Sequence, residues 1–183
     1  MHWIPTPLAG AYVLEPERKE DERGYFARVW CDQEAADHGL THRWVQSNTS
    51  FNVHAGTVRG LHYQSQPFPE AKLVRCTRGA LFDVVVDLRG SSPTYARWFA
   101  VELSEKNGRT MYVPKGFAHG FQTMLDATEV SYQMSEVFHP EVARGIRWDD
   151  PRINISWPRC AERIISEKDQ ALPLLRDCGA PFL

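Results

Sequence analysis

The eight-residue stretch TVRGLHYQ (Thr57–Gln64) brings together side chains suited to acid–base chemistry. It holds a cation (Arg59), a histidine (His62) and an amide (Gln64) around one glycine. Alternate residues of an extended strand point to opposite faces, so the spacing predicts His62 inward beside Val58, with Arg59 at the strand's edge or other face. A histidine shielded from water in this way can still exchange a proton near neutral pH. The stretch is therefore a candidate proton-transfer site that needs partners from elsewhere in the chain.

A second histidine lies in the cluster PKGFAHGF (Pro114–Phe121). Its glycines permit close backbone approach, and period two places Phe117, His119 and Phe121 on one face of a strand. A single histidine in such a strand is most simply a hydrogen-bonded core residue, but two of them in glycine-flanked, aromatic strands favour a pocket. The chain has no HxH pair of the kind that metal-binding jelly rolls use, so we expect no metal.

Three further residues could carry protons or charge. Tyr132, in EVSYQM, could present its hydroxyl to a barrel interior, although a core tyrosine with one hydrogen bond fits the pattern equally well. Asp169, in ISEKDQ, lies near the start of a predicted helix, where a cap or a surface charge is the simplest interpretation. Lys72, in EAKLVRC, opens a predicted strand, where a solvated lysine is the default expectation.

The front of the chain has the composition of a nucleotide-binding surface. DERGYF (Asp21–Phe26) places Arg23 on a turn with two aromatic residues, and VQSNTS (Val45–Ser50) is rich in amides and hydroxyls. Guanidinium groups bind phosphate oxygens in pairs, and aromatic rings stack on bases. The chain has no Walker loop and no dinucleotide glycine fingerprint. We therefore expect a nucleotide as part of the substrate and no cofactor.

The bulk composition indicates an ordinary globular enzyme or binding domain. The chain has 183 residues, is 43% hydrophobic and carries a net charge of −2, with its signs interspersed, which argues against a nucleic-acid partner. The N-terminal residues lack the features of a signal peptide, and no apolar run approaches the roughly 20 residues of a membrane span. The four widely spaced cysteines indicate reduced thiols. We expect a cytoplasmic protein with no membrane partner.

The elements that must position these residues are mostly strands of period two. Many short strands separated by regular turn signals predict an all-β sandwich or barrel. The predicted strands are Ala11–Glu15, Tyr25–Trp30, Trp44–Phe51, Val58–Gln64, Lys72–Thr77, Leu81–Leu88, Arg97–Leu103, Thr110–Val113, Gly116–Thr123 and Glu129–Ser135.

Helical pattern is confined to two short stretches. One is Asp32–His38, with Asp32 as the expected N-cap and Gly39 as the stop. The other is Ser166–Leu172, closed by Pro173. We expect one domain over residues 1–183, in which residues 160–183 are mostly loop and short helix packed on the barrel.

The chain resembles the dTDP-4-dehydrorhamnose 3,5-epimerase family in sequence blocks that run in register from about Asp21 to Asp169. The blocks are DERGYF, QSNTS, TVRGLHYQ, AKLVRC, FDVVVDLRGSSPTY, VPKGFAHGF, EVSYQMSE, GIRWDDP, ISWP and ISEKD. The resemblance implies a cupin-like jelly-roll β-sandwich without metal, and a homodimer that exchanges N-terminal strands. It implies a substrate that is a nucleotide-linked 4-keto-6-deoxyhexose, inverted at C3 and C5 or at one of them.

The resemblance also implies roles for individual residues. His62 matches the family's general base, Asp169 the carboxylate paired with it, Tyr132 the proton donor on the opposite face of the sugar, and Lys72 the cation near the C4 oxygen. Residues at further substrate-binding positions are Arg23, Phe26, Gln46, Asn48, Arg59, His119 and Lys168. The set suits the chemistry, because loss of a proton beside a C4 ketone gives an enolate and inversion needs a base and an acid on opposite faces.

Three positions depart from the family's pattern. Arg28 stands where a Glu is common, Ala143 where an acidic residue is common, and Phe138 where a Tyr is common. All three lie around substrate in the family, so CDP is an alternative to dTDP as the nucleotide. Calorimetric titration with both nucleotides would distinguish them, and clearly tighter binding of dTDP would exclude the CDP hypothesis.

Other functions remain compatible with the same residues. An epimerase of C3 or C5 alone is the nearest alternative, and a 3,4-ketoisomerase of the same fold would move the keto group, which NMR of the product detects. A catalytically silent sugar-nucleotide-binding module would show no exchange of substrate protons with deuterated water. A metal-dependent jelly-roll enzyme would carry metal when purified.

Overall fold

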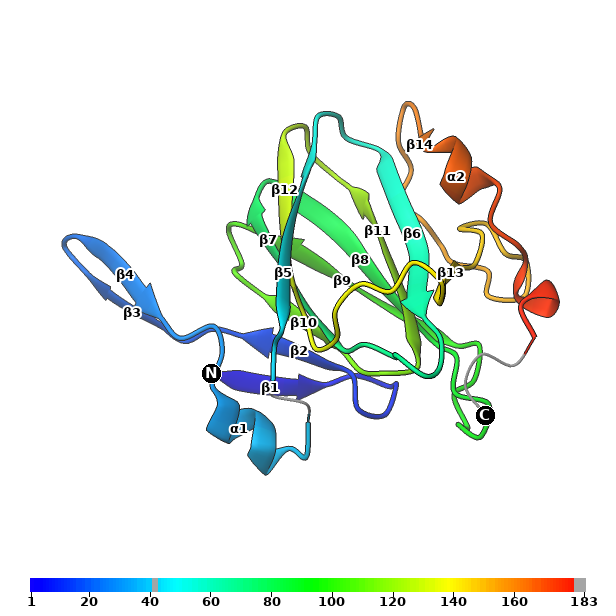
Figure 1. The fold of residues 1–183 in the computed structure, drawn as a ribbon. Helices are drawn as coiled ribbons and strands as arrows, with labels where there is room; N and C mark the ends of the chain where they lie inside the picture. The colour runs from blue at the N-terminus through cyan, green and yellow to red at the C-terminus, as the bar shows by residue number, and fades with distance from the viewer. Residues whose placement is uncertain (41–42, 180–183) are drawn as a thin grey trace.

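The computed structural model describes residues 1–40 and 43–179, and these form two antiparallel sheets packed face to face (Figure 1). The first sheet has the order β1 (His2–Pro5), β2 (Tyr12–Glu15), β10 (Thr110–Val113), β7 (Lys72–Arg78), β12 (Thr128–Met134) and β5 (Gln46–Asn52). The second has the order β13 (Ala143–Gly145), β6 (Thr57–Gln64), β11 (Phe117–Thr123), β8 (Ala80–Asp87) and β9 (Trp98–Ser104). The predicted all-β, jelly-roll sandwich is confirmed.

The remaining elements are a separate hairpin, one short strand added to the second sheet, and short helices. β3 (Arg18–Asp21) and β4 (Gly24–Ala27) form a separate hairpin that extends away from the sandwich (Figure 1). β14 (Ile164–Ile165) pairs in parallel with β6, and it is followed by α2 (Glu167–Gln170) and a short 3₁₀ helix, η1 (Leu175–Asp177). No helix among the described residues has the length and apolar character needed to cross a membrane.

All ten predicted strands are present, with ends shifted by up to three residues, and four strands were missed. β3 has the sequence RKED and shows no apolar alternation, while β1 contains a proline. β13 and β14 have three and two residues, which is too short for any periodicity to appear. The missed strands therefore carry little signal in the sequence.

Both predicted helices are present but shorter than expected. The first, α1, spans Asp32–Asp37, and its N-cap is Cys31, so the prediction of Asp32 as the cap was wrong. The Asp32 carboxylate instead accepts a hydrogen bond of 2.6 Å from the Trp30 indole. In α2 the Ser166 hydroxyl caps the helix by accepting the Asp169 N–H at 3.1 Å.

The core between the sheets follows the period-two pattern of the strands. In β8, Leu81 and Val85 face this core, while Val84 and Val86 belong to a second cluster on the outer face of the same sheet. A strand buried on both faces reads as a nearly continuous apolar run, which explains the sequence ALFDVVVD. Asp83 shares the inward face of Leu81 and Val85 by this alternation.

The C-terminal segment covers that outer face. Leu175 of η1 is 2% exposed and packs in the second cluster with Leu61 and Tyr63 of β6. Between residues 160 and 179 the segment consists of loop with β14, α2 and η1, and residues 180–183 of the predicted segment lie outside the described part. This packing holds α2 beside β6, as Figure 1 shows.

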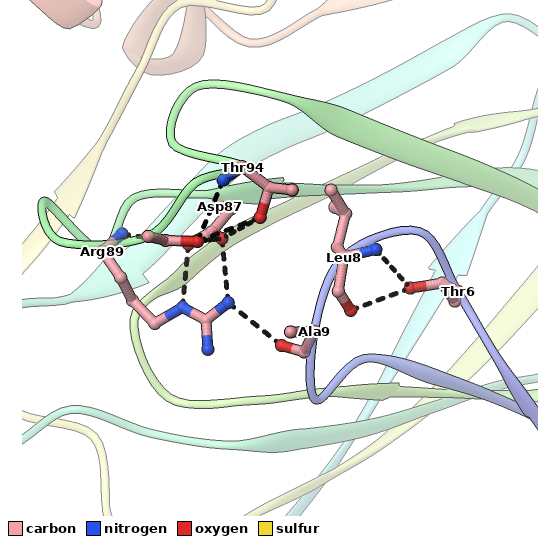
Figure 2. A network of polar contacts seen from close by, with 7 residues as sticks. Thr6, Leu8, Ala9, Asp87, Arg89 and Thr94 are labelled. Atoms are coloured by element: carbon pink, nitrogen blue, oxygen red, sulfur yellow. Dashed lines mark hydrogen bonds and ion pairs between the residues drawn. The ribbon is translucent and has the colours of Figure 1, made fainter.

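A polar network fastens the N-terminal loop to the end of β8 (Figure 2). The fully buried Asp87 carboxylate accepts hydrogen bonds from Arg89, Ser92 and Thr94 at 2.6–2.9 Å. Arg89 also donates to the carbonyl of Ala9 at 3.0 Å. The block DLRGSSPTY is thus a structural clamp outside the cavity described below, in which the buried charge of Asp87 is stable because Arg89, Ser92 and Thr94 all donate hydrogen bonds to it.

β6 and β11 approach each other unusually closely at two glycines. His62 pairs with His119 and Arg59 with Phe121, so β6 has one residue more than β11 between these two pairs. This is a β-bulge, and it reverses the alternation of side chains along β6. Gly60 has φ +120°, and a Cβ there would lie 2.6 Å from the Gly120 Cα.

We predict that Gly60→Ala is strongly destabilising. Positive φ costs an alanine about 1–3 kcal/mol, and overpacking against backbone adds about 1–3 kcal/mol. Gly24→Ala is the matched control, because Gly24 has φ +128° but nothing within 4 Å of its Cβ position. Urea unfolding should show a clearly larger loss of stability for Gly60→Ala than for Gly24→Ala. Equal losses would contradict the close approach.

Candidate active site

A cavity of about 260 Å³ lies between the two sheets at the bulge. Strands of both sheets contribute to its wall. The lining residues are Asn48 and Ser50 of β5, Arg59 and His62 of β6, Lys72 of β7, His119, Gly120 and Phe121 of β11, and Tyr132 and Met134 of β12. Six of the eleven residues predicted for the site therefore line one cavity.

His62 is held by a carboxylate from the far end of the chain. Its Nε2 lies 2.7 Å from Asp169 Oδ1, and the second oxygen of Asp169 accepts the Gly60 N–H at 3.1 Å. Burial alone would raise the pKa of Asp169, but the hydrogen bond and charge of His62, with the Gly60 N–H, hold this pKa below its usual value. The ionised carboxylate can only accept, so His62 Nε2 carries the proton and Nδ1 carries the lone pair.

Two expectations for this part of the chain were wrong. Asp169 is 5% exposed and bonded to His62, so it is neither a surface charge nor the cap of α2. Arg59 lines the same cavity as His62, because the bulge inserts a residue between them and turns Arg59 inward. The His62 side chain faces this cavity as predicted but is 43% exposed in the single chain, so it is less shielded than expected.

Tyr132 reaches the cavity from the opposite sheet. It shares one face of β12 with Val130 and Met134 and packs against the core between the sheets. Burial raises the pKa of the Tyr132 phenol, and a hydrogen bond from Ser50 and the charge of Arg59 partly offset that increase. The phenol is therefore protonated at neutral pH and able to donate.

Lys72 is buried instead of solvated, which corrects the default expectation. It shares the inward face of β7 with Val74 and Cys76, and its side chain is 9% exposed. Its ammonium group lies 3.0 Å from the carboxylate of Glu70. The result is a fixed cation in the cavity wall.

His119 forms a second histidine–carboxylate pair under the cavity. Its Nε2 lies 2.7 Å from Asp83 Oδ1, and both side chains are at most 5% exposed. Burial raises the pKa of Asp83, and the charge and hydrogen bond of His119 partly compensate for it. The predicted grouping of Phe117, His119 and Phe121 on one face is confirmed. Within the described chain no three His, Cys, Asp or Glu side chains form a group able to hold a metal ion.

Of the amides of β5, Asn48 lines the cavity and the others contact its neighbours. The Gln46 amide donates to the Asn48 side chain at 3.3 Å and accepts the Phe138 N–H at 3.0 Å. Arg59 donates from Nε to Asn52 at 2.8 Å. Gln46 is thus one residue removed from the cavity, and the binding roles of these residues stay predictions.

Three predicted binding residues lie away from the cavity of their own chain. Arg23 is at the tip of the β3–β4 hairpin, with its side chain 84% exposed and paired to Asp21. Phe26 of the same hairpin is 72% exposed. Lys168 is exposed on α2 beside Asp169. Among the positions that depart from the family pattern, Arg28, Phe138 and Ala143 do not line the cavity either.

The structure adds residues that the sequence interpretation missed: Ser50, Asn52, Glu70 and Asp83. Asp83 had a usable signal, because a carboxylate on the inward face of an apolar strand must have a partner. Glu70 also had one, since residues 70 and 72 of an extended chain share a face. Ser50 and Asn52 lie on β5 but act through contacts with other strands, which spacing does not show.

Comparison with known proteins places this geometry in a family. The family model described as dTDP-4-dehydrorhamnose 3,5-epimerase matches residues 5–177. A protein of Sinorhizobium fredii with that name is 45% identical and covers 100% of this chain and 93% of its own length. One from Methanothermobacter thermautotrophicus is 47% identical, covering 96% and 95%.

A solved structure of a relative has the same fold as this chain. The dTDP-6-deoxy-D-glucose-3,5-epimerase of Legionella pneumophila, in complex with dTDP-4-keto-L-rhamnose, superposes with a TM-score of 0.93 at 37% identity. The superposition covers 100% of this chain and 98% of that one. The match extends over the whole sandwich, including both sheets and the C-terminal segment that supplies Asp169. The chain belongs to the dTDP-4-dehydrorhamnose 3,5-epimerase family.

Proposed function

We propose that this protein epimerises a dTDP-linked 4-keto-6-deoxyhexose at C3 and C5 by proton abstraction and reprotonation. The observation that carries the proposal is the placement of His62 and Tyr132 on opposing sheets, with Lys72 on β7, the strand next to that of Tyr132. A sugar ring in this cavity has a base on one face and an acid on the other. The names of the relatives and the ligand of the Legionella structure support this substrate class.

His62 is the proposed base. Its Nδ1 lone pair takes the proton from the carbon next to the C4 ketone, and the C–H electron pair moves into the enolate. The imidazolium that forms is stabilised by the ionised Asp169, which lies 2.7 Å from Nε2. Asp169 also fixes the ring's orientation, since its second oxygen is tied to the backbone of β6.

Lys72 is the proposed partner of the developing charge. Removal of the proton places negative charge on the C4 oxygen, and a fixed cation in a buried cavity stabilises such charge far better than it would in water. Tyr132 then donates its phenolic proton to the same carbon from the opposite face, which inverts the centre. His62 then releases its proton to solvent, and Tyr132 takes up a proton from solvent. These two transfers complete the cycle.

The nucleotide must lie largely outside the cavity. A volume of about 260 Å³ is below the roughly 300–1,000 Å³ of pockets that enclose whole drug-sized ligands, so it suits the sugar alone. The matched relatives and the Legionella ligand carry dTDP in their names, which favours dTDP over CDP. The four unpaired thiols are those of a reducing compartment and support a cytoplasmic location.

We further propose a homodimer in which the β3–β4 hairpin completes the site of the partner. The hairpin extends away from its own sandwich (Figure 1) and exposes the aromatic rings of Tyr25 and Phe26 with the guanidinium of Arg23. Rings and a guanidinium are the groups that bind a base and a diphosphate. β1 and β2 pair within their own sheet, so the hairpin is the N-terminal element to be exchanged.

His62→Ala tests the base assignment. Without the imidazole, exchange of the C3 and C5 protons with deuterated water should fall by at least about 100-fold, the low end of general-base effects, while dTDP binding stays near wild type. Proton NMR and calorimetry measure the two quantities. His54→Ala, an exposed histidine outside the cavity, is the control.

Retained exchange in His62→Ala would remove His62 as the base. Wild-type protein that shows no exchange with any 4-keto sugar nucleotide would instead indicate the silent binding module. Exchange at C3 or C5 alone would identify a mono-epimerase.

Mixing two inactive variants tests the exchanged hairpin. His62→Ala subunits have an intact hairpin, and Arg23→Ala/Phe26→Ala subunits have an intact base. Random reassociation should restore about one quarter of the sites, because half of the dimers are mixed and each has one complete site. Epimerase activity before and after mixing is the measurement. Activity that stays at the sum of the separate variants would contradict hairpin exchange.

A further inference from the structure

We propose that Glu70 is a positioning residue that holds the Lys72 ammonium in place for the enolate, a role that rests on the proposed function. The Glu70 carboxylate lies 3.0 Å from Lys72 Nζ. The two side chains are 6% and 9% exposed, so this is a buried ion pair, and its lysine lines the cavity. Neither the mechanism above nor the site residues expected from the sequence include Glu70.

The backbone places the two residues for this contact. Glu70 and Lys72 lie two apart in an extended segment, so their side chains leave on the same face. Ala71 between them is fully buried and fixed by two hydrogen bonds to Ser135: its N–H donates to the Ser135 hydroxyl at 2.7 Å, and its carbonyl accepts the Ser135 N–H at 3.0 Å. Ser135 directly follows β12, the strand that carries Tyr132. The position of Glu70 is therefore tied to the acid side of the site.

The buried ammonium of Lys72 needs an anion beside it. A buried ammonium without a partner is costly, and its neutral form would be favoured. The other carboxyl whose charge acts on Lys72 is Asp83, but burial raises the pKa of Asp83 and its Oδ1 is bonded to His119. Glu70 is thus the carboxylate placed to compensate the buried charge of Lys72.

The contact also leaves Lys72 able to act. An ammonium has three N–H donors, and Glu70 is the partner that the described structure gives it. The remaining donors can reach a substrate oxygen. Glu70 Oε2 is buried and has no hydrogen-bond partner among the described residues, so the carboxylate is committed to Lys72 and not to a wider scaffold.

The test compares Glu70→Gln with Glu15→Gln in the folded protein, well below the melting temperature. Glu15 also loses an ion pair, with Arg109 at 2.7 Å, but lies outside the cavity. Glu70→Gln should lower kcat for epimerisation by about tenfold, less than the roughly 100-fold or greater loss from removing a direct donor. KM and dTDP affinity should change less than about twofold, and Glu15→Gln should change neither.

A double-mutant cycle with Lys72→Met shows whether Glu70 acts through Lys72. The two losses in kcat should not multiply, because Glu70 has no charge to position once Lys72 is gone. Multiplying losses, or unchanged kcat in Glu70→Gln, would overturn the proposal while active wild-type protein still upholds the epimerase. If Glu70→Gln fails to fold, Glu70→Asp, which keeps the charge but shortens its reach, takes its place in the same cycle.

Discussion

The 2.7 Å hydrogen bond between His62 Nε2 and Asp169 Oδ1 is the contact on which the site depends. It joins β6 of the second sheet to α2, more than a hundred residues later in the chain. It forms because the C-terminal segment packs its apolar residues on the outer face of that sheet and so brings α2 to the edge of β6. The same carboxylate bonds the Gly60 N–H, so the bulge and the base are fixed together. If the C-terminal segment did not pack on this sheet, neither the bulge nor His62 would be held by Asp169.

The two sheets divide the chemistry between them. The second sheet supplies the base and the His119–Asp83 pair, while the first supplies the phenol of Tyr132 and the ammonium of Lys72. Groups on two packed sheets face each other across the interior, which is the arrangement that inversion of a carbon centre requires. Burial raises the pKa of Tyr132, so the acid side is protonated; burial would also raise the pKa of Asp169, but the hydrogen bond from His62 lowers it and keeps this carboxylate ionised.

The sequence predicts the strands and the inward-facing positions of His62 and His119, because both follow from period two. Tyr132 fitted a core tyrosine equally well and Lys72 was expected to be solvated, so alternation did not predict their places in the cavity. Prediction from alternation fails where a bulge interrupts the strand. The bulge at Gly60 brings Arg59 into the cavity, and no alternating pattern in the sequence predicts this. The pairing of His62 with Asp169 depends on tertiary packing, so it came from the family resemblance alone. Glu70 and Asp83 were within reach of the rule that buried charges need partners.

The central claim is that His62 and Tyr132 work on opposite faces of the sugar. Proton NMR of the Tyr132→Phe variant in deuterated water, with a dTDP-linked 4-keto-6-deoxyhexose, tests it most directly. His62 should still remove the substrate proton, exchange it with the deuterated solvent and return a deuteron to the same face, so deuterium should enter with retained configuration. Formation of the inverted product should fall by about 100-fold or more, as expected for a missing general acid. Inversion at the wild-type rate would contradict the account.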